Sequence, residues 1–455
     1  MSGSERPDDL LELCRRVAAQ ATGTEQIEAY ASRGHETDIE VVHGQVESLT
    51  VATSGGVGIR VVDRGRQGFA WAGSLDDDVV ADTLGAARDN ARFAEPDDAV
   101  ALATPSDAQG DVVALDLWRD DLASVPTDDK VAFAIALDAQ LRAADSRVTG
   151  VEAAGYGDVA VCGALATSTG IESSARRTHA SAYLFAMADD GRGVQTGYGV
   201  KAGRTFGDLD GAEIVEMARD RATRLLGAKK APSRRLTVVL DPLVTASVLG
   251  LVAAAFNGES MLKGRSLFAD RLGEQVAAPL VELADDPTDA RSLGASERDA
   301  EGVPCRRNVL LGAGVMQGFL HNTYTARRSG TTTTGSAVRG GYRSTPGVGT
   351  RSLRLQPGAR SPEQVIADVG DGLYVQAVHG LHSGTNPISG DFSVGVEGLV
   401  IRDGALAEPV REVTIASTIP RMLLAVRAVA SDALYLPGGA VGTTIAVDEM
   451  TMSGA

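Results

Sequence analysis

The sequence has few aromatic residues and no long uninterrupted hydrophobic run. Aromatic side chains make up 4% of the 455 residues, whereas glycine occurs 53 times. Cores therefore have to be filled by Ala, Val and Leu, and many turns need positive φ angles, which favours a strand-rich fold with tight connections. The hydrophobic content of 44% is nevertheless sufficient to fill two or three domains of a globular protein.

Cysteine is also scarce. Cys14, Cys162 and Cys305 are far apart and show no C-x-x-C spacing, which argues against a disulfide framework and against a cysteine zinc knuckle. The start of the chain, MSGSERPDD, has neither a basic n-region nor an apolar h-region, and the longest apolar run, Val248 to Phe256, is interrupted by Gly250. That run is too short to span a bilayer, so we expect a reduced, cytoplasmic protein without a membrane partner.

Basic residues are outnumbered by acidic ones, and the formal net charge is −17. A phosphate backbone is bound by Lys and Arg that neutralise it, so this charge argues against direct binding of nucleic acid. We interpret the acidic surplus as a feature that favours solubility.

The N-terminal half shows a repeated order of elements. Helices are predicted at Asp8 to Ala21, Asp77 to Phe93, Thr127 to Ala144 and Gly211 to Leu226. Strands are predicted at Gln26 to Ser32, Thr37 to Val42, Val46 to Ala52, Val57 to Val62, Gly68 to Ala72, Val148 to Ala154, Val159 to Ala166, Thr178 to Ala188 and Val194 to Lys201. Helix, antiparallel strands and helix occur twice, which predicts one α+β domain of two similar layers.

A small, basic segment with one proline, residues 227–235, separates this half from the next. We place the domain boundary there, which gives an N-terminal α+β domain at residues 1–230 and a C-terminal domain at residues 236–455.

The C-terminal half is rich in strands and glycines. A buried strand at Leu236 to Leu240 is followed by Asp241 as a helix N-cap and Pro242 at the first helical position, which predicts a helix over Leu243 to Phe256. Further strands are predicted at Leu280 to Leu283, Asn308 to Leu311, Ser352 to Leu355, Gly372 to Val378, Phe392 to Arg402 and Arg411 to Ala416, and a helix at Thr418 to Val429. This density of strands predicts a sheet that curls toward a barrel.

Five motifs follow one another in this half. They are DAEGVP from Asp299, GTTTTGSAVR from Gly330, DGLY from Asp371, GTNPISGDFS from Gly384 and PVREVTIA from Pro409. Together and in this order they closely resemble the TldD/PmbA family. The NPxxGDFS form and the EVTIA segment are more similar to the PmbA branch, also called TldE, than to TldD.

The resemblance implies a role without a metal. In the TldD branch a helix carries a zinc-binding His-Glu-x-x-x-His motif, and a cysteine near the C-terminus adds a further ligand. The corresponding segment here is Leu249-Gly250-Leu251-Val252-Ala253-Ala254, and residues 436–447 contain no cysteine. Zinc hydrolysis needs imidazole or thiolate ligands and a carboxylate base, so the resemblance implies no cofactor in this chain.

The zinc is then expected in a TldD-like paralogue that pairs with this chain, and the resemblance implies that the complex degrades unfolded or small peptides. This chain would be a metallopeptidase subunit that positions and confines the substrate. The family has also been labelled as modulators of DNA gyrase, and the net charge predicts that any such effect is indirect.

Several residues are candidates for substrate binding. Thr331 to Thr334 form a hydroxyl-rich loop that suits a peptide backbone or a carboxylate, although a twisted Thr-rich strand edge is an equal alternative. The loop is not a phosphate loop, because no Lys follows Gly335. The full set of candidates is Thr333, Thr334, Arg339, His379, His382, Asn386, Asp391 and Ser393.

His379 and His382 are the only closely spaced histidine pair. Their spacing allows them to chelate a metal, and the alternative is that they are loop histidines that line a cleft and bond to the backbone. Asp391 is either a general base or a cap of backbone amides in its Gly-Asp-Phe-Ser turn.

Two rival functions follow. One is a non-enzymatic, homodimeric peptide-binding module, and the other is a divergent hydrolase that uses His379, His382 and Asp391 with a metal of its own. Cys305 lies beside arginines but no spaced His and Asn support a triad, so we interpret it as an incidental thiol.

Overall fold

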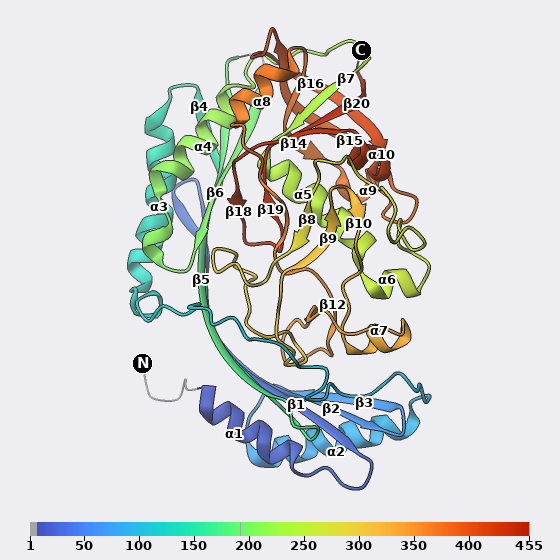
Figure 1. The fold of residues 1–455 in the computed structure, drawn as a ribbon. Coiled ribbons are helices and arrows are strands. Elements are labelled where there is room, and N and C mark those ends of the chain that lie inside the picture. The colour runs from blue at the N-terminus through green and yellow to red at the C-terminus, as the bar shows by residue number, and fades with distance from the viewer. Residues whose placement is uncertain (1–6, 192, 455) are drawn as a thin grey trace.

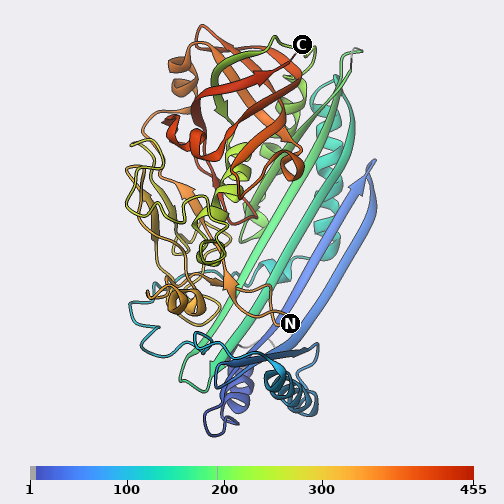
Figure 2. The same ribbon diagram turned by 90° about the vertical axis from the view of Figure 1, so that its right-hand side faces the viewer.

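The N-terminal half is built on one long antiparallel sheet. The computed structural model describes residues 7–191 and 193–454, and its first six strands pair in the order β3-β2-β1-β4-β5-β6. They run side by side along one flank of the molecule (Figure 1, Figure 2). Their bounds are β1 Gln26–Val42, β2 Gln45–Asp63, β3 Arg66–Ala72, β4 Val148–Thr167, β5 Glu172–Asp189 and β6 Val194–Gly203.

Four helices cover one face of this sheet. They are α1 Pro7–Ala18, α2 Asp77–Phe93, α3 Thr127–Ala144 and α4 Gly211–Thr223. The first two share one hydrophobic core with β1, β2 and β4, and the last two share another core with β1, β4 and β5. Among the described residues, none of the helices is both long and apolar enough to cross a membrane.

The predicted repeat of helix, strands and helix is confirmed, but the two copies do not form two layers. They meet at the antiparallel pair β1–β4 and continue one sheet, with α1 and α2 at one end and α3 and α4 at the other (Figure 2). The prediction of layers was wrong because pairing between β1 and β4 is a long-range contact that local periodicity does not show.

Several predicted strands also proved to be halves of longer ones. Gln26 to Ser32 and Thr37 to Val42 are both parts of β1, because the polar residues between them still pair with β2 and β4. In the same way Val46 to Ala52 and Val57 to Val62 belong to β2, and Val148 to Ala154 and Val159 to Ala166 belong to β4. Backbone pairing with partner strands, on both sides for β1 and β4 and with β1 alone for residues 53–56 of β2, outweighs the local break in alternation.

The C-terminal half contains a closed barrel of five strands. The order β16-β15-β14-β7-β20 is closed by pairing between β16 and β20, and β17 adds to β20 outside this ring. The expected curled sheet is therefore confirmed. The strands are β7 Arg234–Leu240, β14 Gly372–His379, β15 Asp391–Arg402, β16 Ala405–Thr418, β17 Val426–Val429 and β20 Ile445–Ser453.

The remaining elements of this half surround the barrel. The strands β8 Leu283–Asp285, β9 Asn308–Gly312, β10 Val315–Met316 and β13 Leu353–Leu355 form a four-stranded sheet. The short pairs are β11 Ala337–Val338 with β12 Gly347–Val348, and β18 Leu434–Tyr435 with β19 Val441–Gly442. The helices are α5 Pro242–Ala253, α6 Gly258–Leu262, α7 Thr323–Arg328, α8 Pro362–Val369, α9 Leu381–Gly384 and α10 Ile419–Leu424, and the 3₁₀ turns are η1 Leu122–Ser124, η2 Phe206–Asp208 and η3 Ala254–Phe256.

Two predictions in this half need correction. The helix expected over Thr418 to Val429 ends at Leu424, and β17 follows it because Val426 and Val429 pair with Val447 and Ile445 of β20. The strand expected at Leu280 to Leu283 begins only at Leu283, where pairing with β9 and β13 starts. In both places a distant partner strand decides the conformation.

Buried charges attach the C-terminal half to the long sheet. Glu28 of β1 accepts hydrogen bonds from the guanidinium groups of Arg60 at 2.7 Å and Arg339 at 2.8 Å, and it is 2% exposed. Burial by itself raises the pKa of Glu28, but Arg339 and Arg60 outweigh that effect and lower it. Arg60 also lies 3.8 Å from Glu301, so charges of both signs are compensated in this cluster.

Candidate functional site at helix α5

Helix α5 begins with the cap that the sequence predicts. Oδ1 of Asp241 accepts a hydrogen bond from the Leu243 N–H at 2.9 Å, and Pro242 occupies the first turn. Oδ2 of Asp241 accepts from Arg221 at 2.7 Å and from the Tyr374 hydroxyl at 2.6 Å. The start of α5 is therefore tied to α4 and to the barrel strand β14.

The side chains of α5 do not fit a zinc ion. Leu249 is 3% exposed and packs in the barrel core, and the positions Gly250 and Ala254 carry no donor atom. The end of β19 approaches the start of the helix, where a Cβ on Gly442 would lie 2.1 Å from the Pro242 carbonyl oxygen. At this contact the helix meets main-chain atoms and no thiol group, because residues 436–447 contain no cysteine.

A groove of about 210 Å³ lies beside α5, between the long sheet and the barrel. Phe185 and Tyr198 of the sheet form one wall, and Ser247 of α5 with His379 of β14 forms part of the other. Arg221, whose guanidinium bonds to Asp241, closes one side. The groove thus joins an aromatic wall to a few polar groups, which is the usual composition of a small-molecule or peptide site.

His379 is held by a carboxylate across the hairpin of β14 and β15. Its Nε2 lies 3.3 Å from Oε1 of Glu397, and the hydrogen bond with Glu397 raises the pKa of His379 above its ordinary value. His382 lies in α9 and is exposed. Among residues 7–191 and 193–454, no three His, Cys, Asp or Glu side chains are grouped so that they could hold a metal.

The turn before β15 is closed by its own side chains. Oδ1 of Asn386 accepts from the Ile388 N–H at 2.9 Å and the Ser389 N–H at 3.2 Å. Oδ2 of Asp391 accepts from the Ser389 hydroxyl at 2.6 Å, and Ser393 is exposed on β15 opposite Ala416. Asn386 and Asp391 therefore both make hydrogen bonds within the turn.

The second half of the threonine loop is turned inward, whereas Thr331 and Thr332 are exposed. The hydroxyls of Thr333 and Thr334 each donate to the His321 carbonyl oxygen at 3.1 Å, and Thr333 is 3% exposed. Arg339 lies 4.6 Å over the Tyr30 ring in addition to its bond with Glu28. These three side chains are thus occupied by contacts inside the protein.

The candidate residues therefore fall into two groups. Arg339 lines a cavity against the long sheet, whereas His379 lines the groove beside α5. In Figure 1 the segment around β12 and α7 lies well apart from α9 and β15. The structure does not bring the threonine loop and the Asn386 to Ser393 turn into one cleft, and their roles in binding stay predictions.

Sequence reasoning missed Glu397 and Arg221 as parts of the groove. Ala377 faces Glu397 in the antiparallel register, so His379 is two residues from that pair on the same face. A sequence that predicts the strands β14 and β15 shows that His379 and Glu397 are close only if the register of the two strands is also known. Cys305 is buried, and burial raises the pKa of its thiol to about 12, which makes it unreactive.

Comparison with known proteins identifies the class. Three family models match consecutive parts of the chain: PmbA/TldA metallopeptidase domain 1 at residues 27–91, the central domain at 120–226 and the C-terminal domain at 233–454. The chain belongs to the PmbA/TldD family of metallopeptidases.

Curated relatives agree with this assignment. Metalloprotease PmbA of Escherichia coli O157:H7 is 26% identical over 397 residues, which cover 87% of this chain and 85% of the relative. The metalloprotease PmbA homolog of Haemophilus influenzae is 24% identical and covers 90% of this chain and 88% of its own length.

Solved structures share the fold. TldE from Thermococcus kodakarensis superposes with a TM-score of 0.89 at 22% identity and covers 98% of this chain and 99% of its own. A protein from Thermotoga maritima described as a putative modulator of a DNA gyrase gives a TM-score of 0.90 at 23% identity, with 97% and 99% covered.

Proposed function

We propose that this chain is the subunit of a TldD/TldE-type peptidase complex that does not hold the zinc, and that a TldD-like paralogue supplies the metal. The observation that carries the proposal is the lack of ligand side chains along α5 and at the start of the following 3₁₀ turn η3. Leu249, Gly250 and Ala254 stand where the family resemblance expects zinc ligands, and the whole sequence contains no His-Glu-x-x-x-His segment. The likeness to a chain named TldE and the matches to chains named TldD homolog support the proposal.

The contribution of this subunit is to position peptide and to exclude water. The groove beside α5 offers aromatic surface from Phe185 and Tyr198 and polar groups from Ser247 and His379. Such a wall orients an extended peptide for hydrolysis at the zinc-bound water of the partner, and good positioning alone accelerates a reaction substantially.

The arrangement of His379 favours this proposal over a metal site in this chain. Nε2 of His379 already faces Glu397 at 3.3 Å, and the exposed His382 has no third ligand among the described residues. A structural zinc needs four ligands and a catalytic zinc three, so two histidines are too few.

The experiment is reconstitution of peptidase activity from separate subunits. Purified chain, a purified TldD-like paralogue and their mixture are assayed on an unfolded casein substrate, with and without a chelator. We expect chelator-sensitive cleavage in the mixture, and a loss of that cleavage when the glutamate of the paralogue's His-Glu-x-x-x-His motif is replaced by glutamine. Chelator-sensitive cleavage by this chain alone would contradict the proposal.

Ser247→Leu tests the groove itself. The exposed Ser247 hydroxyl bonds only to the Leu243 carbonyl oxygen at 3.0 Å, so leucine fills the groove at small cost to the fold. Turnover of the mixed complex should decrease while association is unchanged. Glu408→Gln, on the exposed surface of β16, is the matched control and should leave both unchanged.

A further inference from the structure

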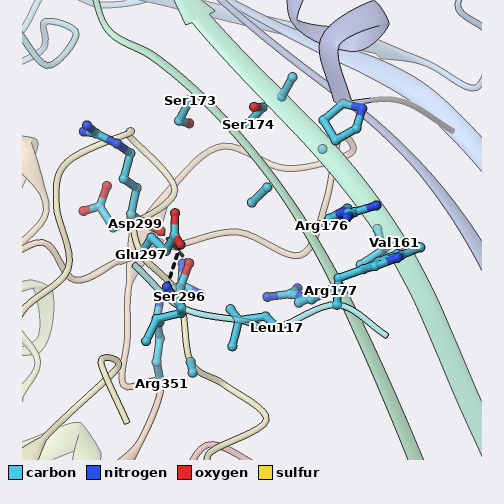
Figure 3. A pocket seen from close by; sticks show the side chains of 18 of the residues that line it. Leu117, Val161, Ser173, Ser174, Arg176, Arg177, Ser296, Glu297, Asp299 and Arg351 are labelled. Atoms are coloured by element: carbon cyan, nitrogen blue, oxygen red, sulfur yellow. Dashed lines mark hydrogen bonds between the residues drawn. The ribbon is translucent and has the colours of Figure 1, made fainter. Parts of the chain in front are cut away.

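A second cavity, of about 450 Å³, lies where β5 extends beyond the end of β6. β6 pairs with β5 only from Ala180 onward, and the preceding stretch of β5 is instead covered by the segment Leu115 to Trp118. The Thr178 N–H donates to the Leu117 carbonyl oxygen at 3.0 Å, which fixes this covering segment. The loop that carries Ser296 and Glu297 forms the opposite wall (Figure 3).

Small residues make the floor of this cavity hollow. Gly163 of β4 pairs with Ala175 of β5, and the next pair on the same face is Val161 with Arg177. A Cβ on Gly163 would lie 2.9 Å from the Tyr30 hydroxyl, so a larger residue there meets the neighbouring side chain. The gap left by Gly163 and Ala175 is bordered by the Arg177 side chain.

Arg177 is a cation without a counter-charge. Figure 3 shows Arg177 projecting from β5 into the space between this strand and the loop that carries Glu297. Its guanidinium makes no hydrogen bond or ion pair with any residue of the described chain, and its exposed surface borders the cavity.

The other cations of the cavity differ from Arg177 in their surroundings. Arg339 is paired with Glu28 at 2.8 Å, and Arg176 lies 5.0 Å over the Trp118 ring and 4.0 Å from Asp120. Arg351 donates to the Ala337 carbonyl oxygen at 3.0 Å, but its buried Nε has no partner among the described residues. The guanidinium groups of Arg177, Arg339 and Arg351 therefore have unused N–H donors beside this cavity.

The unpaired guanidinium of Arg177 at the edge of this cavity can pair with a bound anion. A guanidinium matches the two oxygens of a carboxylate or phosphate, and the hydroxyls of Ser173 and Ser174 add further donors to the lining. The carboxylate of Glu297 on the opposite wall repels a second negative charge. The volume is in the range of small-molecule sites.

We propose that this cavity is a binding site for a small molecule with a single carboxylate, which Arg177 contacts from β5 and Arg351 from the C-terminal half. The site is separate from the groove beside α5, and it does not depend on the proposed peptidase role. Because its two walls come from the two halves of the chain, an occupant bridges them.

Trp118 provides the test, because it lines the cavity and the chain has only one other tryptophan, Trp71. In a Trp71→Phe background the fluorescence of Trp118 is titrated with N-acetylalanine, with its neutral amide and with inorganic phosphate. We expect a saturable change with N-acetylalanine, a Kd at least tenfold higher for the amide and for phosphate, and no change in the circular dichroism spectrum.

Three variants sharpen the titration. Arg177→Gln should raise the Kd for N-acetylalanine at least tenfold, and Ala175→Leu should do the same by filling the hollow without changing charge. Arg234→Gln, an exposed arginine on β7, is the matched control and should keep the Kd within twofold. The proposal is overturned if no saturable change occurs, if Arg177→Gln binds as tightly as the parent, or if phosphate binds as tightly as the carboxylate.

Discussion

Two regions on the face of the long sheet that meets the C-terminal half differ in how their cations are paired. At Glu28 the guanidinium groups of Arg60 and Arg339 converge on one carboxylate, and every formal charge has a partner. At Arg177, on β5, which β4 separates from β1, a cation borders a cavity and has no partner within the described chain. The first arrangement compensates its charges within the protein, whereas the second leaves a cation for the ligand that we propose.

The largest effect on stability is expected when the carboxylate of Glu28, which pairs with Arg60 and Arg339, is removed. Glu28→Gln leaves Arg60 and Arg339 buried without their carboxylate, which should lower the free energy of unfolding by about 3–5 kcal/mol. Urea denaturation measures this change in the free energy of unfolding. Glu408→Gln removes an exposed partner of Arg402 and should cost less than about 1 kcal/mol. Equal effects of the two changes would show that burial at Glu28 is not decisive.

The pH dependence of stability tests a carboxyl group beside the same interface. Burial, with the nearby charge of Glu301, raises the pKa of Asp299 to about 7 from an ordinary value of 3.8. The folded state therefore binds the proton of Asp299 more tightly than the unfolded state does. The stabilisation that this proton gives to the folded state is full below pH 3.8 and is lost as the pH rises through 7. The free energy of unfolding should decrease by up to about 1.4 kcal/mol per pH unit from this group.

Urea denaturation of the wild type and Asp299→Asn between pH 5 and 8 measures that slope. The variant lowers stability at every pH, because an amide cannot accept all of the hydrogen bonds from the Glu301, Val303 and Ala337 N–H groups. The pKa of Asp299 is tested only by the slope of the free energy of unfolding against pH. That slope should be flatter in the variant than in the wild type. Parallel curves would contradict the raised pKa.

Replacing Arg177 should change the stability of the protein in the opposite direction to replacing Glu28. Arg177→Gln removes a charge that has no partner, so the ligand-free protein should become slightly more stable, by less than about 1 kcal/mol because water in the cavity screens the charge. Thermal unfolding in a buffer without carboxylates measures it. A clear loss of stability would mean that Arg177 has a structural partner, and the contrast between the two regions would disappear.

The smallest effect is expected at the exposed pair of His379 and Glu397. The hydrogen bond with Glu397 raises the pKa of His379, so its small stabilising effect is present at low pH and is lost as the pH rises through that raised value. The His379 side chain is 59% exposed, which keeps the contribution minor. NMR titration should give a pKa above 6.5 for His379 and a lower value in Glu397→Gln; an unchanged value would exclude the pairing.

Much of this fold could be predicted from local patterns. Helices α2 and α3 have the predicted bounds, and Asp241 with Pro242 marked the start of α5, because capping residues and apolar periodicity are local signals. The continuity of β1 and the change from α10 to β17 at Val426 could not be predicted, because partner strands distant in sequence determine both.

The site was less predictable than the fold. The family motifs contain residues such as Thr333, Asn386 and Asp391, whose hydrogen bonds in the structure are made within their own loops. Arg177 lies in none of the five motifs, and its isolation depends on the contacts of two halves of the chain. The domain boundary at residues 227–235 and the cytoplasmic location stay predictions.

The measurement that tests the central claim most directly is the metal content of this chain, purified alone and after exposure to excess zinc followed by desalting. Because Leu249 and Gly250 of α5 and Ala254 just beyond it stand where ligands are expected, elemental analysis should find far less than one zinc per chain, and the TldD-like paralogue treated in the same way should retain one. One tightly held zinc per chain here, lost on His379→Ala or His382→Ala, would contradict the account and favour a hydrolase with its own metal.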